Sequence, residues 1–136
     1  MPLEIANIQD PRELSPLVLA YVGDAVYELL VRTRILEQGN APVQKLHSRT
    51  VRRVCAAAQA EGLHRIEPML TEEELSVYRR GRNTHNNIPK NASPAVYRAS
   101  TGLEALFGYL YLKGEKARID ALFSVIWEGE QAEEEL

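Results

Sequence analysis

The chain has 136 residues, of which 45% are hydrophobic, and a formal net charge of −3. This length and composition suit a single globular domain, 1–136, and leave no room for a second module. The one cysteine, Cys55, excludes an internal disulfide or a cysteine-built zinc site. The N-terminus lacks a secretion signal and no apolar run approaches the ~20 residues of a membrane span, so we expect a cytoplasmic protein without membrane contact.

The first predicted element is a long helix. Ser15 followed by Pro16 is typical of a helix start, and apolar periodicity continues to Leu36 before Gly39 ends it. The helix is apolar around most of its circumference and therefore needs neighbours on more than one side. Either the interior of the monomer or a second copy of the chain would satisfy this need. Asp24 lies in its most apolar run, where an acid is unusual.

The middle of the chain is also predicted to be helical. Residues 42–60 form a second helical stretch that we expect Gly62 to end. Thr71 and Glu74 match a capping box at the start of a third helix. Residues 83–93 are rich in asparagine and contain a proline, which predicts a polar loop. No strand pattern competes, so the predicted fold class is an all-α helical bundle.

Two further helices complete the predicted layout. Ser93 begins a helix that carries Glu104 and runs to Leu112. Gly114 separates it from a last amphipathic helix. The residues from about 128 onward are strongly acidic, and we expect them to form a frayed, solvated tail.

Asp24 and Glu104 are the most informative residues, because a carboxylate buried without a partner costs roughly several kcal/mol. Gly23 precedes the first acid, while Gly102 and Gly108 bracket the second, and interior helical glycines cost up to ~1 kcal/mol each. Close packing of the two helices would explain the glycines. Two facing carboxylates then need a shared proton or a bound cation, which predicts a magnesium site. The alternative is that each acid pairs with an arginine.

Basic residues concentrate in two windows that contain no acid, one between Glu37 and Glu61 and one between Glu74 and Glu104. These windows hold nine of the 16 lysines and arginines. Such sorting suits contact with phosphates on one surface, although solvated helix faces would look the same. The nine residues are Lys45, Arg49, Arg52, Arg53, Arg79, Arg80, Arg82, Lys90 and Arg98.

Several ordered motifs carry a resemblance to a known family. Residues 22–26 (VGDAV) and 104–108 (EALFG) are similar to the two catalytic helices of ribonuclease III. Residues 80–83 (RGRN), 89–91 (PKN) and 97–101 (YRAST) narrow the resemblance to the Mini-ribonuclease III group. That group has the ribonuclease III-like catalytic domain but lacks the double-stranded RNA-binding domain.

The resemblance implies a magnesium-dependent endoribonuclease that cleaves double-stranded RNA and leaves 5′-phosphate and 3′-hydroxyl ends. Asp24 and Glu104 would be both the metal ligands and the catalytic residues, with Mg²⁺ as cofactor and no small-molecule cofactor. The family role would be to mature the ends of the 23S rRNA precursor in the large ribosomal subunit. The resemblance also implies a homodimer in which each subunit cuts one strand and the paired sites leave a short 3′ overhang.

Duplex RNA would be recognised through its phosphates and backbone shape, because side chains do not read the narrow A-form major groove. The loop 83–93 would then adjust substrate preference. The expected RNA-binding residues are Arg79, Arg82, Asn83, Lys90, Asn91 and Arg98, with Arg49, Arg52 and Arg53 as a second, weaker cluster.

The chain departs from full-length ribonuclease III at two positions, where Ala20 and Thr101 replace further acids. One firmly held ion is therefore the stronger expectation, with Glu28 or, through water, Thr101 in its outer shell. Glu28 can equally pair with Arg32, one helical turn away. Two alternatives stay open: a catalytically weak or inactive ribosome-associated RNA-binding module of the same fold, and a helical scaffold that binds another protein.

Overall fold

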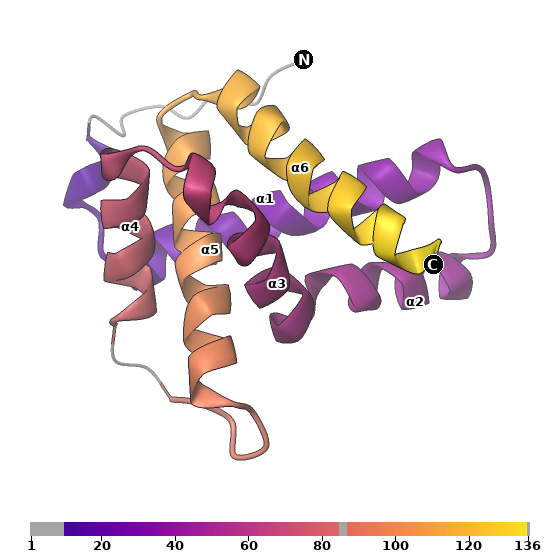
Figure 1. Ribbon diagram of the computed structural model, residues 1–136, viewed down its shortest axis with the longest axis horizontal. Coiled ribbons are helices and arrows are strands. Elements are labelled where there is room, and N and C mark those ends of the chain that lie inside the picture. The colour runs from indigo at the N-terminus through magenta and orange to yellow at the C-terminus, as the bar shows by residue number, and fades with distance from the viewer. Residues whose placement is uncertain (1–9, 85–86, 136) are drawn as a thin grey trace.

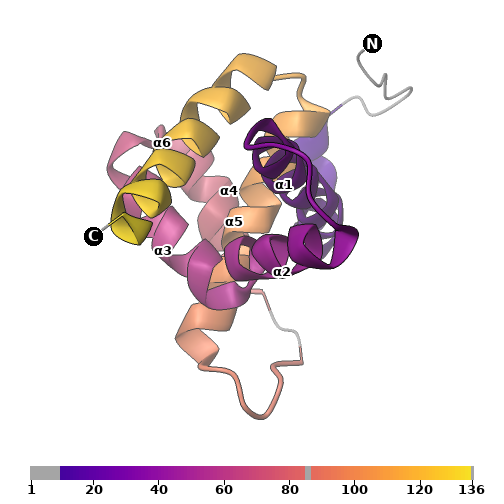
Figure 2. The same ribbon diagram turned by 90° about the vertical axis from the view of Figure 1, so that its right-hand side faces the viewer.

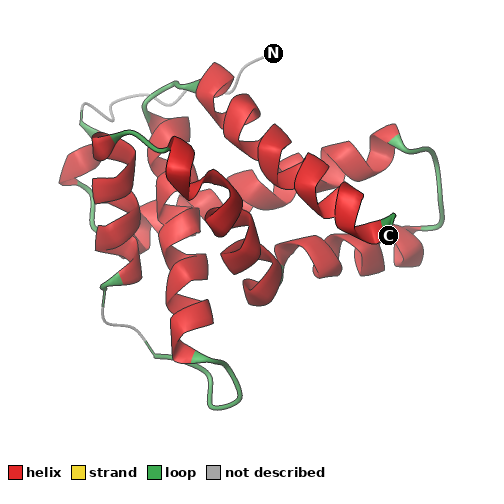
Figure 3. Cartoon of the chain, viewed as in Figure 1, coloured by secondary structure: helices red, strands yellow, loops and turns green. Residues whose placement is uncertain are grey.

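The computed structural model describes residues 10–84 and 87–135, which form helices joined by short connections (Figures 1 and 3). No strand occurs among these residues, and the all-α prediction is confirmed. Within the same ranges, no helix combines the length and the apolar composition needed to cross a membrane. The elements in chain order are η1 (Pro11–Glu13), α1 (Pro16–Glu37), α2 (Val43–Val54), α3 (Ala56–Ile66), η2 (Glu67–Met69), α4 (Glu72–Arg82), α5 (Pro94–Leu112) and α6 (Lys116–Glu134).

Helix α5 forms the centre of the bundle, with α1, α3, α4 and α6 packed around it (Figures 1 and 2). Every residue from Ala99 to Leu110 is buried except Glu104, which is partly exposed. An apolar helix surrounded on all sides is what its composition requires. Glu104 therefore marks the one point in this stretch where the core reaches the surface.

Aromatic rings tie three helices together in the core. The Tyr27 ring of α1 lies 5.3 Å from Phe107 of α5 and 5.5 Å from Phe123 of α6, edge-on in both cases. Edge-to-face pairs of this kind add about 0.5–1.5 kcal/mol each beyond the burial of area. Helix α6 thereby fixes α1 against α5.

The predicted helix starts are confirmed by their capping hydrogen bonds. The hydroxyls of Ser15 and Ser93 accept from backbone N–H groups in the first turns of α1 and α5. Thr71 and Glu74 form the reciprocal capping box of α4. Glu74 is also buried and accepts from Arg118 of α6 at 2.8 Å, so the cap joins α4 to the last helix.

The second predicted helix is in fact two helices, and the prediction that Gly62 ends it is wrong. Cys55 adopts an extended backbone conformation between α2 and α3, and α3 continues through Gly62 to Ile66. A Cβ at Gly62 would press on the Ile126 side chain. This glycine therefore serves packing between α3 and α6.

The expected frayed tail is also wrong, because α6 continues as a helix to Glu134. Two arginines from the middle of the chain hold its acidic end. Arg53 of α2 pairs with Glu130 and Glu134, and Arg65 of α3 pairs with Glu133. Charge composition alone predicts repulsion between acids and does not reveal these partners.

Candidate active site

Helices α1 and α5 cross with their backbones in contact at two glycines. A Cβ added to Gly23 would overlap the backbone carbonyl oxygen of Glu104, and one added to Gly108 would overlap the carbonyl oxygen of Leu19. Only glycine allows this approach, which accounts for two residues that weaken an isolated helix. The crossing brings together the side chains beside it, Asp24 from α1 and Glu104 from α5.

The two acids differ in exposure. We expected both within apolar surroundings, but Asp24 is exposed and Glu104 is partly exposed. The sequence reading of Asp24 is wrong because the outward face of α1 is not covered within the monomer. The Asp24 carboxylate nevertheless lies close enough to Glu104 to raise the pKa of the Glu104 carboxyl.

The surroundings of Glu104 favour its neutral form. Partial burial, together with the neighbouring Asp24 carboxylate, raises the pKa of Glu104 to about 8 from its usual 4.5, opposed only by the amide of Gln59. Neither acid forms an ion pair with a basic residue within 10–84 and 87–135. The alternative in which an arginine neutralises each acid is therefore absent from this part of the structure, and the pair needs a proton or a cation.

Gln59 is a residue of the site that sequence reasoning missed. It is 1% exposed on α3, its Nε2 donates to Glu104 Oε2 at 3.5 Å, and its Oε1 accepts from the hydroxyl of Ser100. A signal was present in the sequence, because Gln59 is the one polar position on the stripe that continues through Leu63 and Ile66, at spacings of four and seven residues.

The two proposed outer-shell residues have other partners. Glu28 pairs with Arg32 at 2.7 Å, as the alternative reading anticipated. Thr101 is buried, and its hydroxyl donates to the backbone carbonyl oxygen of Tyr97. In this structure neither side chain therefore belongs to the carboxylate pair.

The main basic set lies at one end of the molecule. It follows the C-terminal end of α4, the loop 83–93 and the first turns of α5 (Figure 1). The Arg82 guanidinium lies 5.6 Å from the centre of the Tyr78 ring and is partly buried. Residues 85–86 of this loop lie outside the described residues. The other members of the predicted set are exposed: Arg79, Asn83, Lys90, Asn91 and Arg98.

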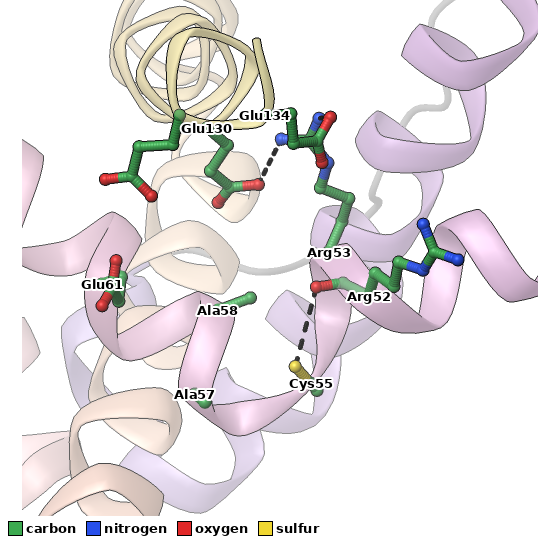
Figure 4. A pocket seen from close by; sticks show the side chains of 9 residues that line it. Arg52, Arg53, Cys55, Ala57, Ala58, Glu61, Glu130 and Glu134 are labelled. Atoms are coloured by element: carbon green, nitrogen blue, oxygen red, sulfur yellow. Dashed lines mark hydrogen bonds and ion pairs between the residues drawn. The ribbon is translucent and has the colours of Figure 1, made fainter. Parts of the chain in front are cut away.

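The three arginines of the second basic cluster differ in their exposure. Arg49 and Arg52 are exposed, but Arg53 is 6% exposed and contacts Glu130 at 2.5 Å and the ring of Trp127 at 4.3 Å. Figure 4 shows Arg53 directed toward α6, beside a pocket that also carries acidic side chains. Placing Arg53 on an RNA-binding surface is therefore wrong, because its charge is already used within the fold.

Comparison with known proteins agrees with this geometry. Residues 17–115 match the model of the ribonuclease III domain. The chain is 53% identical to the Mini-ribonuclease 3 of Symbiobacterium thermophilum over 83% of its own length and 88% of that protein. It is 55% identical to the Mini-ribonuclease 3 of Thermoanaerobacter sp., with coverages of 85% and 82%.

A crystal structure of a Fusobacterium nucleatum protein superposes with a TM-score of 0.80 at 29% identity, covering 88% of this chain and 96% of that one. An all-helical domain with paired acids at a glycine crossing thus defines the class, a ribonuclease III-like nuclease. The chain belongs to the ribonuclease III family and, within it, to the Mini-ribonuclease III group.

Proposed function

We propose that this protein is a magnesium-dependent endoribonuclease that cleaves double-stranded RNA and that Asp24 and Glu104 are its catalytic residues. Membership of the ribonuclease III family supports the RNA endonuclease activity. The observation that carries the choice of residues is the pairing of two carboxylates across a crossing of α1 and α5 that only glycine permits. A like-charge pair that is partly buried at Glu104 and has no basic partner among the described residues is costly for a fold, so its presence supports a functional role.

The donor set fits a magnesium ion. Mg²⁺ commonly uses one or two carboxylates and completes its coordination with water and substrate phosphates. Asp24 and Glu104 supply two carboxylates, and no group of three or more His, Cys, Asp or Glu side chains placed to hold a metal occurs in the described residues. The Glu104 carboxylate, whose pKa is raised, would be deprotonated on binding and would then share its charge with the cation.

Each acid has a distinct task in this proposal. When bound, a divalent cation supplies positive charge that polarises the scissile phosphodiester and favours a water nucleophile. Glu104, fixed in the rigid core helix α5, defines the position of the site. Asp24 is exposed beside Glu104. A negatively charged RNA strand can approach Asp24 only once the two carboxylates are neutralised. Hydrolysis would leave 5′-phosphate and 3′-hydroxyl ends.

The exposed basic set at the α4–α5 end would hold the RNA through its phosphates. Arg79 and Arg98 come from different helices, and Lys90 from the loop between them, so together they present charge along one end of the molecule. Contacts of this kind recognise duplex shape more than sequence. We assign the 23S rRNA precursor in the large ribosomal subunit as the substrate, on the basis of the group to which the chain belongs.

A homodimer would cover the outward face of α1. Val18, Tyr21 and Leu29 lie on this face at helical spacing and are 45%, 81% and 61% exposed. The same face borders a shallow hollow with Tyr111 and Ile119. Exposed apolar patches of this kind mark interaction sites. Light scattering should show a dimer that Tyr21→Glu converts to monomers, and a monomeric wild-type protein would refute this part of the proposal.

The test of the function is digestion of precursor rRNA and of a plain RNA duplex by the purified protein, with Mg²⁺ or with a chelator. We expect cleavage only with Mg²⁺ and fragments that map to the ends of 23S rRNA. Glu37→Gln, at the far end of α1, is the matched control for loss of an acid. Binding without cleavage under all conditions would instead support the inactive RNA-binding module, for which Ala20 and Thr101 are the motivating residues.

A further inference from the structure

The side chain of Gln59 is buried deeply for a polar group. It is 1% exposed on α3, a helix that packs against α5. A primary amide removed from water is costly unless both of its ends find hydrogen-bond partners. The partners of Gln59 therefore explain why an amide occupies this position.

Both partners come from the same face of α5. Ser100 and Glu104 are four residues apart, which places them one above the other on the helix. The Ser100 hydroxyl donates to Gln59 Oε1, and Gln59 Nε2 donates to Glu104 Oε2 at 3.5 Å. Glu104 Oε2 accepts the hydrogen bond, so it pairs with the NH₂ end of the amide and leaves the oxygen end for the hydroxyl. The two contacts thus fix the orientation of the amide.

The neutrality of Gln59 matters at this position. An arginine or lysine in contact with Glu104 would cancel the charge of the carboxylate and compete with any cation. The amide holds one oxygen of Glu104 but does not cancel the negative charge that the carboxylate carries once it is ionised. Hydrogen-bond donors next to metal-binding carboxylates commonly orient the carboxylate toward the metal in this way.

We propose that Gln59, anchored by Ser100, is a positioning residue that holds Glu104 from the interior side so that its carboxylate stays turned toward Asp24 and open to a divalent cation. This inference rests on the proposed function, because the cation is common to both. It adds a third helix, α3, to a site that the two acids alone would assign to α1 and α5.

The contact itself can be tested without metal. In ¹⁵N spectra of the metal-free protein, the side-chain NH₂ of Gln59 should exchange with solvent at least about tenfold more slowly than those of Gln38 and Gln44, which are exposed. Glu104→Ala should shift the Gln59 signals and speed their exchange. Exchange of Gln59 as fast as that of the two exposed glutamines would overturn the proposal.

The consequence for ion binding is tested by Mn²⁺ calorimetry on the RNA-free protein, with circular dichroism to confirm folding. Gln59→Met removes the amide at nearly constant volume and should weaken Mn²⁺ binding by about 10–100-fold. In a Glu104→Gln background the same substitution should change nothing further, because Gln59 acts only through Glu104. Equal Mn²⁺ affinity of wild type and folded Gln59→Met, or an equal loss in both backgrounds, would overturn the proposal.

Ser100→Ala keeps the amide but removes its anchor, so it provides the same comparison if Gln59→Met does not fold. We expect a smaller loss of Mn²⁺ affinity, about threefold, and no loss would count against the proposal.

If wild-type protein neither binds Mn²⁺ nor cleaves RNA, the proposed function fails together with the role of Gln59 in ion binding. Normal wild-type binding that is insensitive to Gln59→Met overturns the role of Gln59 alone.

Discussion

Two acidic regions of this molecule differ in whether arginines pair with their carboxylates. At the end of α6, Glu130, Glu133 and Glu134 all have arginine partners from α2 or α3. At the crossing of α1 and α5, Asp24 and Glu104 lie close together, and among the described residues no basic side chain pairs with either, while the neutral amide of Gln59 contacts Glu104. The acids at the end of α6 are paired with arginines of the fold, whereas we propose that the unmatched pair binds a cation from outside. This contrast separates structural from functional carboxylates better than exposure does.

The largest expected effect comes from removing one acid of the unmatched pair, Asp24 or Glu104. Asp24→Asn or Glu104→Gln should lower cleavage at least about 10³-fold, equivalent to about 4 kcal/mol in activation free energy, because a single carboxylate holds the cation poorly. Folding should be retained or improved, since like-charge repulsion is relieved. Initial rates on duplex RNA, with unfolding curves in urea, measure both. Loss of folding in both variants would indicate a structural pair.

Separating the two helices should also disrupt the unmatched pair. Gly23→Ala places a methyl group on the Glu104 carbonyl oxygen, so α1 and α5 must move apart. We expect a loss of about 3 kcal/mol or more in the free energy of unfolding. Ala121→Gly on the exposed face of α6 is a control that should cost only ~1 kcal/mol. A Gly23→Ala protein as stable as wild type would contradict the close crossing.

A substitution among the arginine-paired acids at the end of α6 should change the stability of the protein and leave RNA cleavage unchanged. Arg53→Met leaves Glu130 partly buried without its partner, and we expect a loss of about 3 kcal/mol in the free energy of unfolding. RNA cleavage by the folded fraction should stay near wild type. Arg52→Met, at the exposed neighbouring position, should change stability by less than about 0.5 kcal/mol. A stable Arg53→Met with weak RNA binding would restore Arg53 to the RNA-binding surface.

The pH dependence of stability should distinguish the two regions in metal-free protein. The pKa of Glu104 is raised to about 8 from the usual 4.5, so the folded state binds more protons than the unfolded state between those values. Its contribution to stability is therefore full below about pH 4.5 and is lost progressively as the pH rises toward 8. Glu104→Gln should remove this decline. Urea unfolding of both proteins at several pH values measures it.

The smallest expected effect concerns RNA docking. Arg98→Ala, near the start of α5, should weaken duplex RNA binding several-fold and reduce the slope of log affinity against log salt by about 1. Lys113→Ala removes the same charge beyond the other end of α5, where it pairs with Glu73, and should leave the slope unchanged. An equal response of the two variants would show that net charge, and not the location of the basic set, governs binding.

Much of this structure was accessible from the sequence because the signals were local. Ser15, Thr71 and Ser93 cap their helices as predicted, and the glycines beside Asp24 and Glu104 pointed to a close crossing. The errors involve partners distant in sequence. The exposure of Asp24 depends on which face of α1 the monomer leaves open, and the burial of Arg53 depends on the return of α6.

The break at Cys55 and the role of Gln59 were missed for a related reason. An alanine-rich run follows Cys55 and favours helix, so the composition carries no sign of the turn. Gln59 has meaning only once α3 lies against α5 and presents the amide to Ser100 and Glu104. Local patterns predict elements and caps, while the partners of buried polar groups follow from the tertiary structure.

The central claim is that the unmatched acid pair accepts a divalent cation. A crystal of the wild-type protein equilibrated with Mn²⁺ tests it directly through anomalous scattering. We expect one strong peak between the carboxylates of Asp24 and Glu104 that disappears in Glu104→Gln. A peak only at the acidic end of α6, or none at the crossing under conditions where the protein cleaves RNA, would contradict the account.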